Sequence, residues 1–171
     1  AVAYGNGIWA MTGGWKNQLN TSYVFTSADG TTWTQRTLPS VNTYLYDIAH
    51  QGGSSSNWVT VGVSGHLFTS TDNAASWTLR TTGTTARLWS AAYGGGTWVV
   101  VGESASEAAG SAVILTSTNL TTWTARASGT GCSLRKVVHD GANFIALGDR
   151  GVRLHSTDGI TWTAQPDLGT R

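Results

Sequence analysis

Ser156-Thr157-Asp158-Gly159-Ile160-Thr161-Trp162 is one of four versions of the same phrase in this chain, and this repetition determines the architecture. The other three are Ser27-Ala28-Asp29-Gly30-Thr31-Thr32-Trp33, Ser70-Thr71-Asp72-Asn73-Ala74-Ala75-Ser76-Trp77 and Ser117-Thr118-Asn119-Leu120-Thr121-Thr122-Trp123. The closing tryptophans lie 39 to 46 residues apart, a period typical of propeller blades and solenoid repeats. The repeat therefore predicts a scaffold built from four copies of one unit.

Each unit carries four short segments rich in β-branched and aromatic residues and bounded by Gly, Asn, Asp or Ser, which is the signature of strands. In the second unit these segments run from Tyr44 to His50, Trp58 to Val63, His66 to Thr71 and Ser76 to Thr82. No helical periodicity is present in the sequence. We therefore expect an all-β fold, a β-propeller of four four-stranded blades. The blades of this single domain, 1–171, are predicted at about 1–37, 38–82, 83–127 and 128–171.

The repeated phrase resembles the Asp-box, or BNR repeat, whose pattern reads Ser-x-Asp-x-Gly-x-Thr-Trp. The third copy departs from it, since Asn119 replaces the Asp and the Gly is missing. The resemblance implies a hairpin between the third and fourth strands of each blade. It names a fold shared by sialidases, other glycosidases, receptors and phage or bacterial surface proteins. The residues that match the motif are Ser27, Asp29, Trp33, Ser70, Asp72, Trp77, Ser117, Asn119, Trp123, Ser156, Asp158 and Trp162.

The chemistry of these residues suits a structural role. Asp and Ser side chains accept hydrogen bonds from the amides of a tight turn, and Gly tolerates positive φ. We expect all four tryptophans to lie in the core, each with a partner for its indole N–H. The arginines three residues after the first three tryptophans, Arg36, Arg80 and Arg126, are expected to pair with neighbouring carbonyls.

Closure of the propeller is predicted from the ends of the repeats. The chain begins with Ala1 rather than Met, within the innermost strand of the first unit, so we expect a processed product or a piece of a longer protein. No spare strand remains to join the first blade to the last. We expect a compact four-bladed ring closed by packing; the alternative is an arc of a larger propeller, completed by another chain or by further sequence.

Composition excludes several classes of partner. Charged residues make up 11% of the chain and the net charge is +1, so neither a nucleic-acid groove nor a polybasic membrane patch is indicated. No apolar run approaches the ~18 residues of a membrane helix, so no membrane insertion is expected. The single cysteine, Cys132, cannot form an internal disulfide.

No catalytic constellation is visible. By resemblance, sialidases need three arginines, a Tyr nucleophile backed by Glu, and an acidic Asp, gathered from six blades. This chain has four repeats and two glutamates, Glu103 and Glu107, in one insertion. No metal spacing, nucleophile motif or phosphate loop offers another chemistry. We therefore expect no catalytic residues, no metal, no cofactor and no enzyme activity.

The loops of one face break the repeat, and irregular loops on a regular scaffold are typical of binding sites. They are rich in aromatic and polar side chains. The predicted ligand-binding residues are Trp15, Lys16, Asn17, Gln18, Tyr46, Arg87, Trp89 and Arg135, with Glu103 and Glu107 as acceptors opposite them. The competing interpretation is that Trp15 and Trp89 only cap the ends of blades.

These observations favour a non-enzymatic structural or binding module on a virion, as a tail, fibre or decoration protein. Its expected partners are other virion or surface proteins, glycans, or both, and an oligomer or larger assembly is compatible with the sequence. A secreted bacterial lectin is the first alternative, and a sialidase-like glycosidase fragment is the second. Both the leading hypothesis and the lectin place the protein on a virion or outside the cell.

Overall fold

The computed structural model describes residues 1–14, 22–39, 43–104 and 112–166, and this part of the chain is all-β. The only helical segments in it are two single 3-10 turns, η1 (Val63–Gly65) and η2 (Asp149–Gly151). No helix in these ranges is long and apolar enough to cross a membrane.

In the described ranges, sixteen strands form four antiparallel four-stranded sheets, one for each repeat. The first sheet contains β1 (Val2–Gly5), β2 (Ile8–Gly14), β3 (Ser22–Ser27) and β4 (Thr34–Arg36). The second contains β5 (Leu45–His50), β6 (Trp58–Gly62), β7 (Leu67–Ser70) and β8 (Thr78–Arg80). The third contains β9 (Arg87–Gly94), β10 (Thr97–Glu103), β11 (Ala112–Ser117) and β12 (Thr124–Arg126). The fourth contains β13 (Leu134–His139), β14 (Phe144–Gly148), β15 (Arg153–Ser156) and β16 (Thr163–Ala164).

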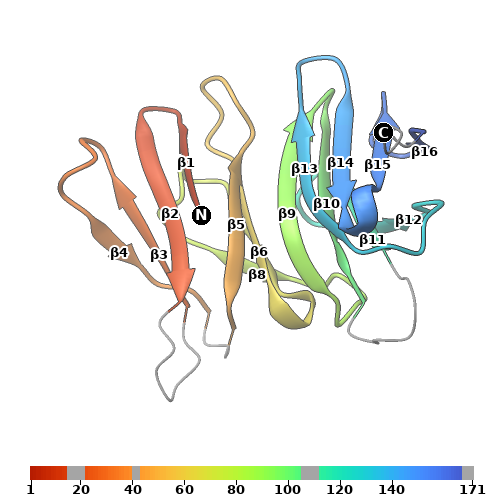
Figure 1. Ribbon diagram of the computed structural model, residues 1–171. Coiled ribbons are helices and arrows are strands. Elements are labelled where there is room, and N and C mark those ends of the chain that lie inside the picture. The colour runs from red at the N-terminus through yellow and green to blue at the C-terminus, as the bar shows by residue number, and fades with distance from the viewer. Residues whose placement is uncertain (15–21, 40–42, 105–111, 167–171) are drawn as a thin grey trace.

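Within each sheet the strands follow the order of the sequence, and the sheets succeed one another as propeller blades do. The first strand of each sheet is its inner strand, and β5, β9 and β13 contact one another in turn. Figure 1 shows the four sheets face to face in a row, with the first and the fourth at opposite ends. The prediction of an all-β propeller is confirmed.

The sheets form an arc instead of the compact ring that we expected. The main contacts join the first sheet to the second, the second to the third and the third to the fourth. Between the described residues of the first and fourth sheets no comparable contact exists. The four sheets leave the circle incomplete, which fits the alternative, an arc of a larger propeller.

The repeated phrases fold as tight turns between the third and fourth strands. In the first turn, the Oγ of Ser27 accepts from the amide of Gly30 at 2.9 Å, and the Oδ1 of Asp29 accepts from the amides of Thr31 and Thr32 at 2.8 and 2.7 Å. The third turn keeps the same bonds with an amide in place of the carboxylate. There, the Oδ1 of Asn119 accepts from the two following turn amides, each at 2.9 Å.

The four closing tryptophans are not equally buried. Trp77 and Trp123 lie in the core, and their indole nitrogens have no hydrogen-bond partner among the described residues. Trp33 and Trp162 are only half-buried, and each indole donates to a glycine carbonyl of its own turn. We expected all four to be core residues with a hydrogen-bonded indole N–H. Trp33 and Trp162 are not core residues, and the indoles of Trp77 and Trp123 have no such partner in the described chain.

The periodic arginines bind hydroxyls instead of the predicted carbonyls. The Nε of Arg36 donates to the Oγ1 of Thr26 at 2.8 Å, and Arg80 and Arg126 make the same bond to Thr69 and Thr116. Each bond joins the outermost strand to the third strand, so these arginines hold the edge of a sheet.

Removal of the buried tryptophans is expected to be costly. Trp77→Ala and Trp123→Ala should each lower the free energy of unfolding by about 3 to 5 kcal/mol, because each leaves a large cavity in the core. Trp33→Ala should cost clearly less, since its ring is already half in water. Urea unfolding of the three variants measures this order, and equal losses in all three would contradict it.

The turn carboxylates are expected to make the protein sensitive to acid. Turn amides lower the pKa of Asp29 and Asp158 below their ordinary value of 3.8. The folded state therefore binds protons less readily than the unfolded state, so stability is full well above pH 4 and falls as the pH drops below that range. Asp29→Asn should keep the turn, as Asn119 does, and should reduce this loss. Melting temperatures between pH 2 and 7 test the effect, and an identical pH profile for the variant would contradict it.

Candidate functional site

Three residues sit at equivalent bulges near the start of the inner strands. The pairing register shifts between Leu45 and Asp47, between Val101 and Gly102, and between Leu134 and Lys136. The first shift leaves Tyr46 unpaired, the second leaves Trp89 unpaired opposite its partner strand, and the third leaves Arg135 unpaired. Bulges turn a side chain away from the regular alternation of a strand.

The three bulge residues form a stack that runs across three sheets. The rings of Tyr46 and Trp89 are stacked, with centroids 4.2 Å apart and an interplanar angle of 23°. The guanidinium carbon of Arg135 lies 5.0 Å from the centroid of the Trp89 ring. Because β5 and β13 flank β9 on opposite sides, both faces of Trp89 are occupied. Tyr46 is the ring at the end of the stack.

Two carboxylates surround Arg135. Its Nε and one terminal nitrogen donate to the two oxygens of Asp149, at 3.0 and 2.8 Å, and that same nitrogen lies 2.9 Å from the carboxylate of Glu103. The guanidinium of Arg87 lies 3.4 Å from Glu103. We call Tyr46, Arg87, Trp89, Glu103, Arg135 and Asp149 the mouth cluster.

Both carboxyl groups of the mouth cluster are held in the charged form. Burial disfavours the charged form of Glu103, but hydrogen bonds from Ser133 and Arg135 and the charge of Arg135 outweigh it, so its pKa lies below 4.5. The hydrogen bond from Arg135 likewise lowers the pKa of Asp149. Asp149 and Glu103 in turn raise the pKa of Arg135. The cluster is thus a network of charged groups around aromatic rings.

Directly after the bulges, a second set of equivalent residues links the same three strands. One oxygen of the buried Asp47 carboxylate accepts from the Oγ of Ser90 at 2.7 Å, from the amide of Ala91 at 3.2 Å and from the Nζ of Lys136 at 3.0 Å. Asp47 therefore ties the second, third and fourth sheets together beneath the stack.

Four of the eight predicted ligand-binding residues come together in the mouth cluster: Tyr46, Arg87, Trp89 and Arg135. The other four, Trp15, Lys16, Asn17 and Gln18, lie outside the described residues, as does Glu107. The sequence analysis missed Asp47 and Asp149. Alignment of the inner strands would have revealed Asp47, since it shares its repeat position with Ser90 and Lys136.

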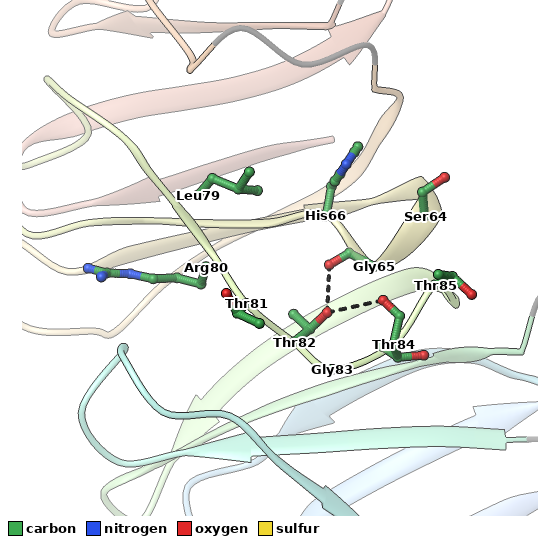
Figure 2. A pocket seen from close by; sticks show the side chains of 10 residues that line it. All are labelled: Ser64, Gly65, His66, Leu79, Arg80, Thr81, Thr82, Gly83, Thr84 and Thr85. Atoms are coloured by element: carbon green, nitrogen blue, oxygen red, sulfur yellow. Dashed lines mark hydrogen bonds between the residues drawn. The ribbon is translucent and has the colours of Figure 1, made fainter.

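An open groove of about 680 Å³ lies between η1 and the chain that leads from β8 to β9. Figure 2 shows the threonines along it and His66 at one side. The Oγ1 of Thr82 lies 2.9 Å from the carbonyl of Gly65, and Arg80 is bonded to Thr69. Burial lowers the pKa of His66. Since these polar groups bond within the second sheet and between η1 and the segment after β8, we regard this groove as structural.

Comparisons with known proteins support the fold. No protein-family model matches the sequence, and no curated protein matches it either. Among solved structures, an ancestral GH74 enzyme superposes with a TM-score of 0.65 and 19% identity, over 95% of this chain and 25% of that one. A GH74 xyloglucanase from Xanthomonas campestris gives 0.60 and 16%, over 93% and 28%. YCF48 bound to D1 peptide gives 0.58 and 21%, over 73% and 41%.

These comparisons change two expectations. The chain spans less than half the length of each of these proteins, which agrees with an incomplete propeller. The expectation that the chain is not an enzyme is overturned, because glycoside hydrolases are among the structures that share its fold. At this level of identity the likeness establishes the fold and leaves the activity to direct tests.

In the described ranges no group of three or more His, Cys, Asp or Glu could hold a metal ion.

Loss of the Asp47 carboxylate is expected to weaken the contact between sheets. Asp47→Ala should lower the free energy of unfolding by about 1 to 3 kcal/mol, since it leaves a buried hydroxyl and a buried amide without their acceptor. Asp47→Asn retains an acceptor oxygen and should cost less. Thermal unfolding of both variants compares them, and a neutral alanine variant would show that this carboxylate does not join the sheets.

Proposed function

We propose that the chain is a carbohydrate-binding propeller module and that the mouth cluster is its binding site. The observation that carries this proposal is the combination of an aromatic ring at the end of a fixed stack with charged groups beside it. Half-buried Tyr46 offers a ring on which the apolar face of a sugar can lie. Arg87, with 58% of its side chain exposed, and Asp149, with 45%, offer a donor and an acceptor for hydroxyl groups.

The side chains of the mouth cluster are already held in place without a ligand, which lowers the entropy cost of binding and so favours ligands that make only weak polar contacts. Trp89 is fixed between two neighbours, and Arg135 is fixed by two carboxylates, so few side chains need to be ordered when a ligand binds. The opposite charges of the cluster nearly cancel, which suits a neutral sugar better than a strongly charged ligand. The xyloglucanase in the comparison acts on a polysaccharide, which adds support from a shared fold.

Location on a virion or cell surface, with surface proteins or glycans as partners, is part of this proposal. The support is the resemblance of the repeats to those of phage and bacterial surface proteins. Incorporation of the protein into purified particles, measured by quantitative mass spectrometry, tests this part. Absence from particles would favour the secreted lectin.

The binding site is tested by titration of the chain with xyloglucan oligosaccharides and by a glycan array. Tyr46→Ala and Arg87→Ala should each weaken binding by tenfold or more. Arg87→Ala should leave the melting temperature nearly unchanged, whereas Tyr46→Ala removes a half-buried stacked ring and should lower it moderately. Leu79→Ala, an exposed residue away from the cluster, is the matched control and should bind normally. Release of reducing sugar in the same samples measures hydrolysis. Sugar binding that survives both cluster variants would contradict the assignment of the site.

A further inference from the structure

The two outermost faces of the arc differ from all equivalent faces inside it. On the face that meets the preceding sheet, one repeat position is held by Trp58, Trp98 and Phe144, which are 0%, 1% and 1% exposed. These residues pack on the preceding sheet, as Trp58 does on Ala10 and Val24. The first sheet has the same kind of residue at this position, Trp9, yet it is 39% exposed.

Other apolar residues lie with Trp9 on the uncovered face of the first sheet. Val2 is 59% exposed and Tyr4 57%, and Tyr4 pairs with Trp9 across the two strands, with ring centroids 4.8 Å apart. The residue equivalent to Val2 is buried in each of the other sheets: Ile48, Ala91 and Val137. We call Val2, Tyr4 and Trp9 the leading face.

The fourth sheet also has exposed apolar residues, but on its opposite face. On the face that meets the following sheet, Val61 and Val101 are fully buried, whereas the equivalent Leu147 is 44% exposed. Beside it, Val138 is 46% exposed. We call Val138 and Leu147 the trailing face. In the sheet, Leu147 lies between Lys136 and Arg153, so this face combines exposed apolar side chains with two cationic ones, and no blade covers it in the described chain.

Residues at the ends of the inner strands make the contacts between neighbouring sheets, and the same residue types are present at the ends of the leading and trailing faces. The strands end alternately in Tyr-Gly and in His followed by a polar residue: Tyr4-Gly5, His50-Gln51, Tyr93-Gly94 and His139-Asp140. From the first sheet to the second, and from the third to the fourth, the His ring lies against the Gly, where a Cβ would come within 2.0 and 2.1 Å of it. From the second sheet to the third, the Nε2 of Gln51 donates to the hydroxyl of Tyr93 at 3.2 Å.

A contact from the fourth sheet to the first would continue this alternation. It would have the same order as the contact from the second sheet to the third. Asp140 stands in the position of Gln51, and Tyr4 stands in the position of Tyr93. A tyrosine hydroxyl can donate to a carboxylate, so the polar pair would be preserved with the roles of donor and acceptor exchanged.

We propose that two copies of this chain pack head to tail, with the trailing face of each on the leading face of the other, and close an eight-bladed ring. One chain carries both halves of the contact, and its first and fourth sheets do not meet in the described ranges. Closed propellers typically have four to eight blades, so two arcs of four give the largest ring of that range. A head-to-tail contact that closes after two copies leaves no uncovered face. This inference is independent of the proposed carbohydrate site.

The mass of the chain in solution tests the proposal. Light scattering coupled to size-exclusion chromatography should give about twice the chain mass of 18.0 kDa. Trp9→Lys and Leu147→Lys should each weaken the dimer tenfold or more, since each places an unpaired charge in the contact. Leu79→Lys, which alters a residue 38% exposed on the second sheet, should stay dimeric. Because all three positions are exposed in the single chain, far-ultraviolet circular dichroism should show the same all-β fold.

A mixture of the two interface variants makes the test specific. Trp9→Lys keeps its trailing face and Leu147→Lys keeps its leading face, so an equimolar mixture should form a heterodimer through one intact contact. A wild-type chain that stays monomeric at tens of micromolar would overturn the proposal. So would a dimer whose mass neither variant changes.

Discussion

Each sheet of this protein carries apolar residues on both faces, and that constraint governs the whole structure. A sheet of this kind cannot be stable alone in water, because burial of both faces requires a neighbour on either side. Three core clusters fill the three spaces between sheets, and each draws residues from both neighbours. The arc satisfies the constraint for the second and third sheets and leaves one face of the first and one of the fourth open to solvent.

The turns between the third and fourth strands are stabilised by hydrogen bonds within each turn, so each sheet has its outer hairpin formed for packing on its neighbours. The hydroxyl and carboxylate of each turn satisfy backbone amides, so the hairpin holds its shape before neighbouring sheets contribute. The position after the Asp or Asn takes positive φ, at 74° in Gly30 and 64° in Leu120. Such a φ is unfavourable for leucine, and burial of the Leu120 side chain in the core offsets the cost. In Gly159, a Cβ would meet Val99 of the preceding sheet at 2.7 Å, so only glycine fits there.

The fold could be predicted from the repeated phrase because the phrase is local: its turn, its strands and its period are all written in consecutive residues. Closure could not be predicted, since it depends on the angle between sheets, which no single repeat encodes. Trp77 packs in the core between the first and second sheets, whereas Trp33 belongs to the first sheet, which no described sheet precedes. The sequence identified Tyr46, Trp89 and Arg135 as candidates separately, but their stack arises from three bulges in different strands. Asp149 shares its repeat position with Glu103, since each follows the equivalent glycine, Gly102 or Gly148, so alignment of the repeats would have revealed this carboxylate too.

The mouth cluster and the uncovered faces are consequences of one architecture. Inner strands placed side by side align equivalent positions, which creates both the stack at their start and the link made by Asp47 beneath it. The same regular repetition makes the leading face a match for the trailing face. A site that draws on three sheets depends on their relative placement, so completion of the ring would also hold the cluster in its shape.

The most direct measurement is a crystal structure of the assembled protein that shows the surroundings of Trp9. We expect a ring in which Trp9 is as buried as Trp58 and Trp98 and packs against Val138 and Leu147 of a second copy. A structure in which Trp9 stays in solvent, with the first and fourth sheets uncovered, would contradict the claim that every sheet face of this protein requires a neighbour.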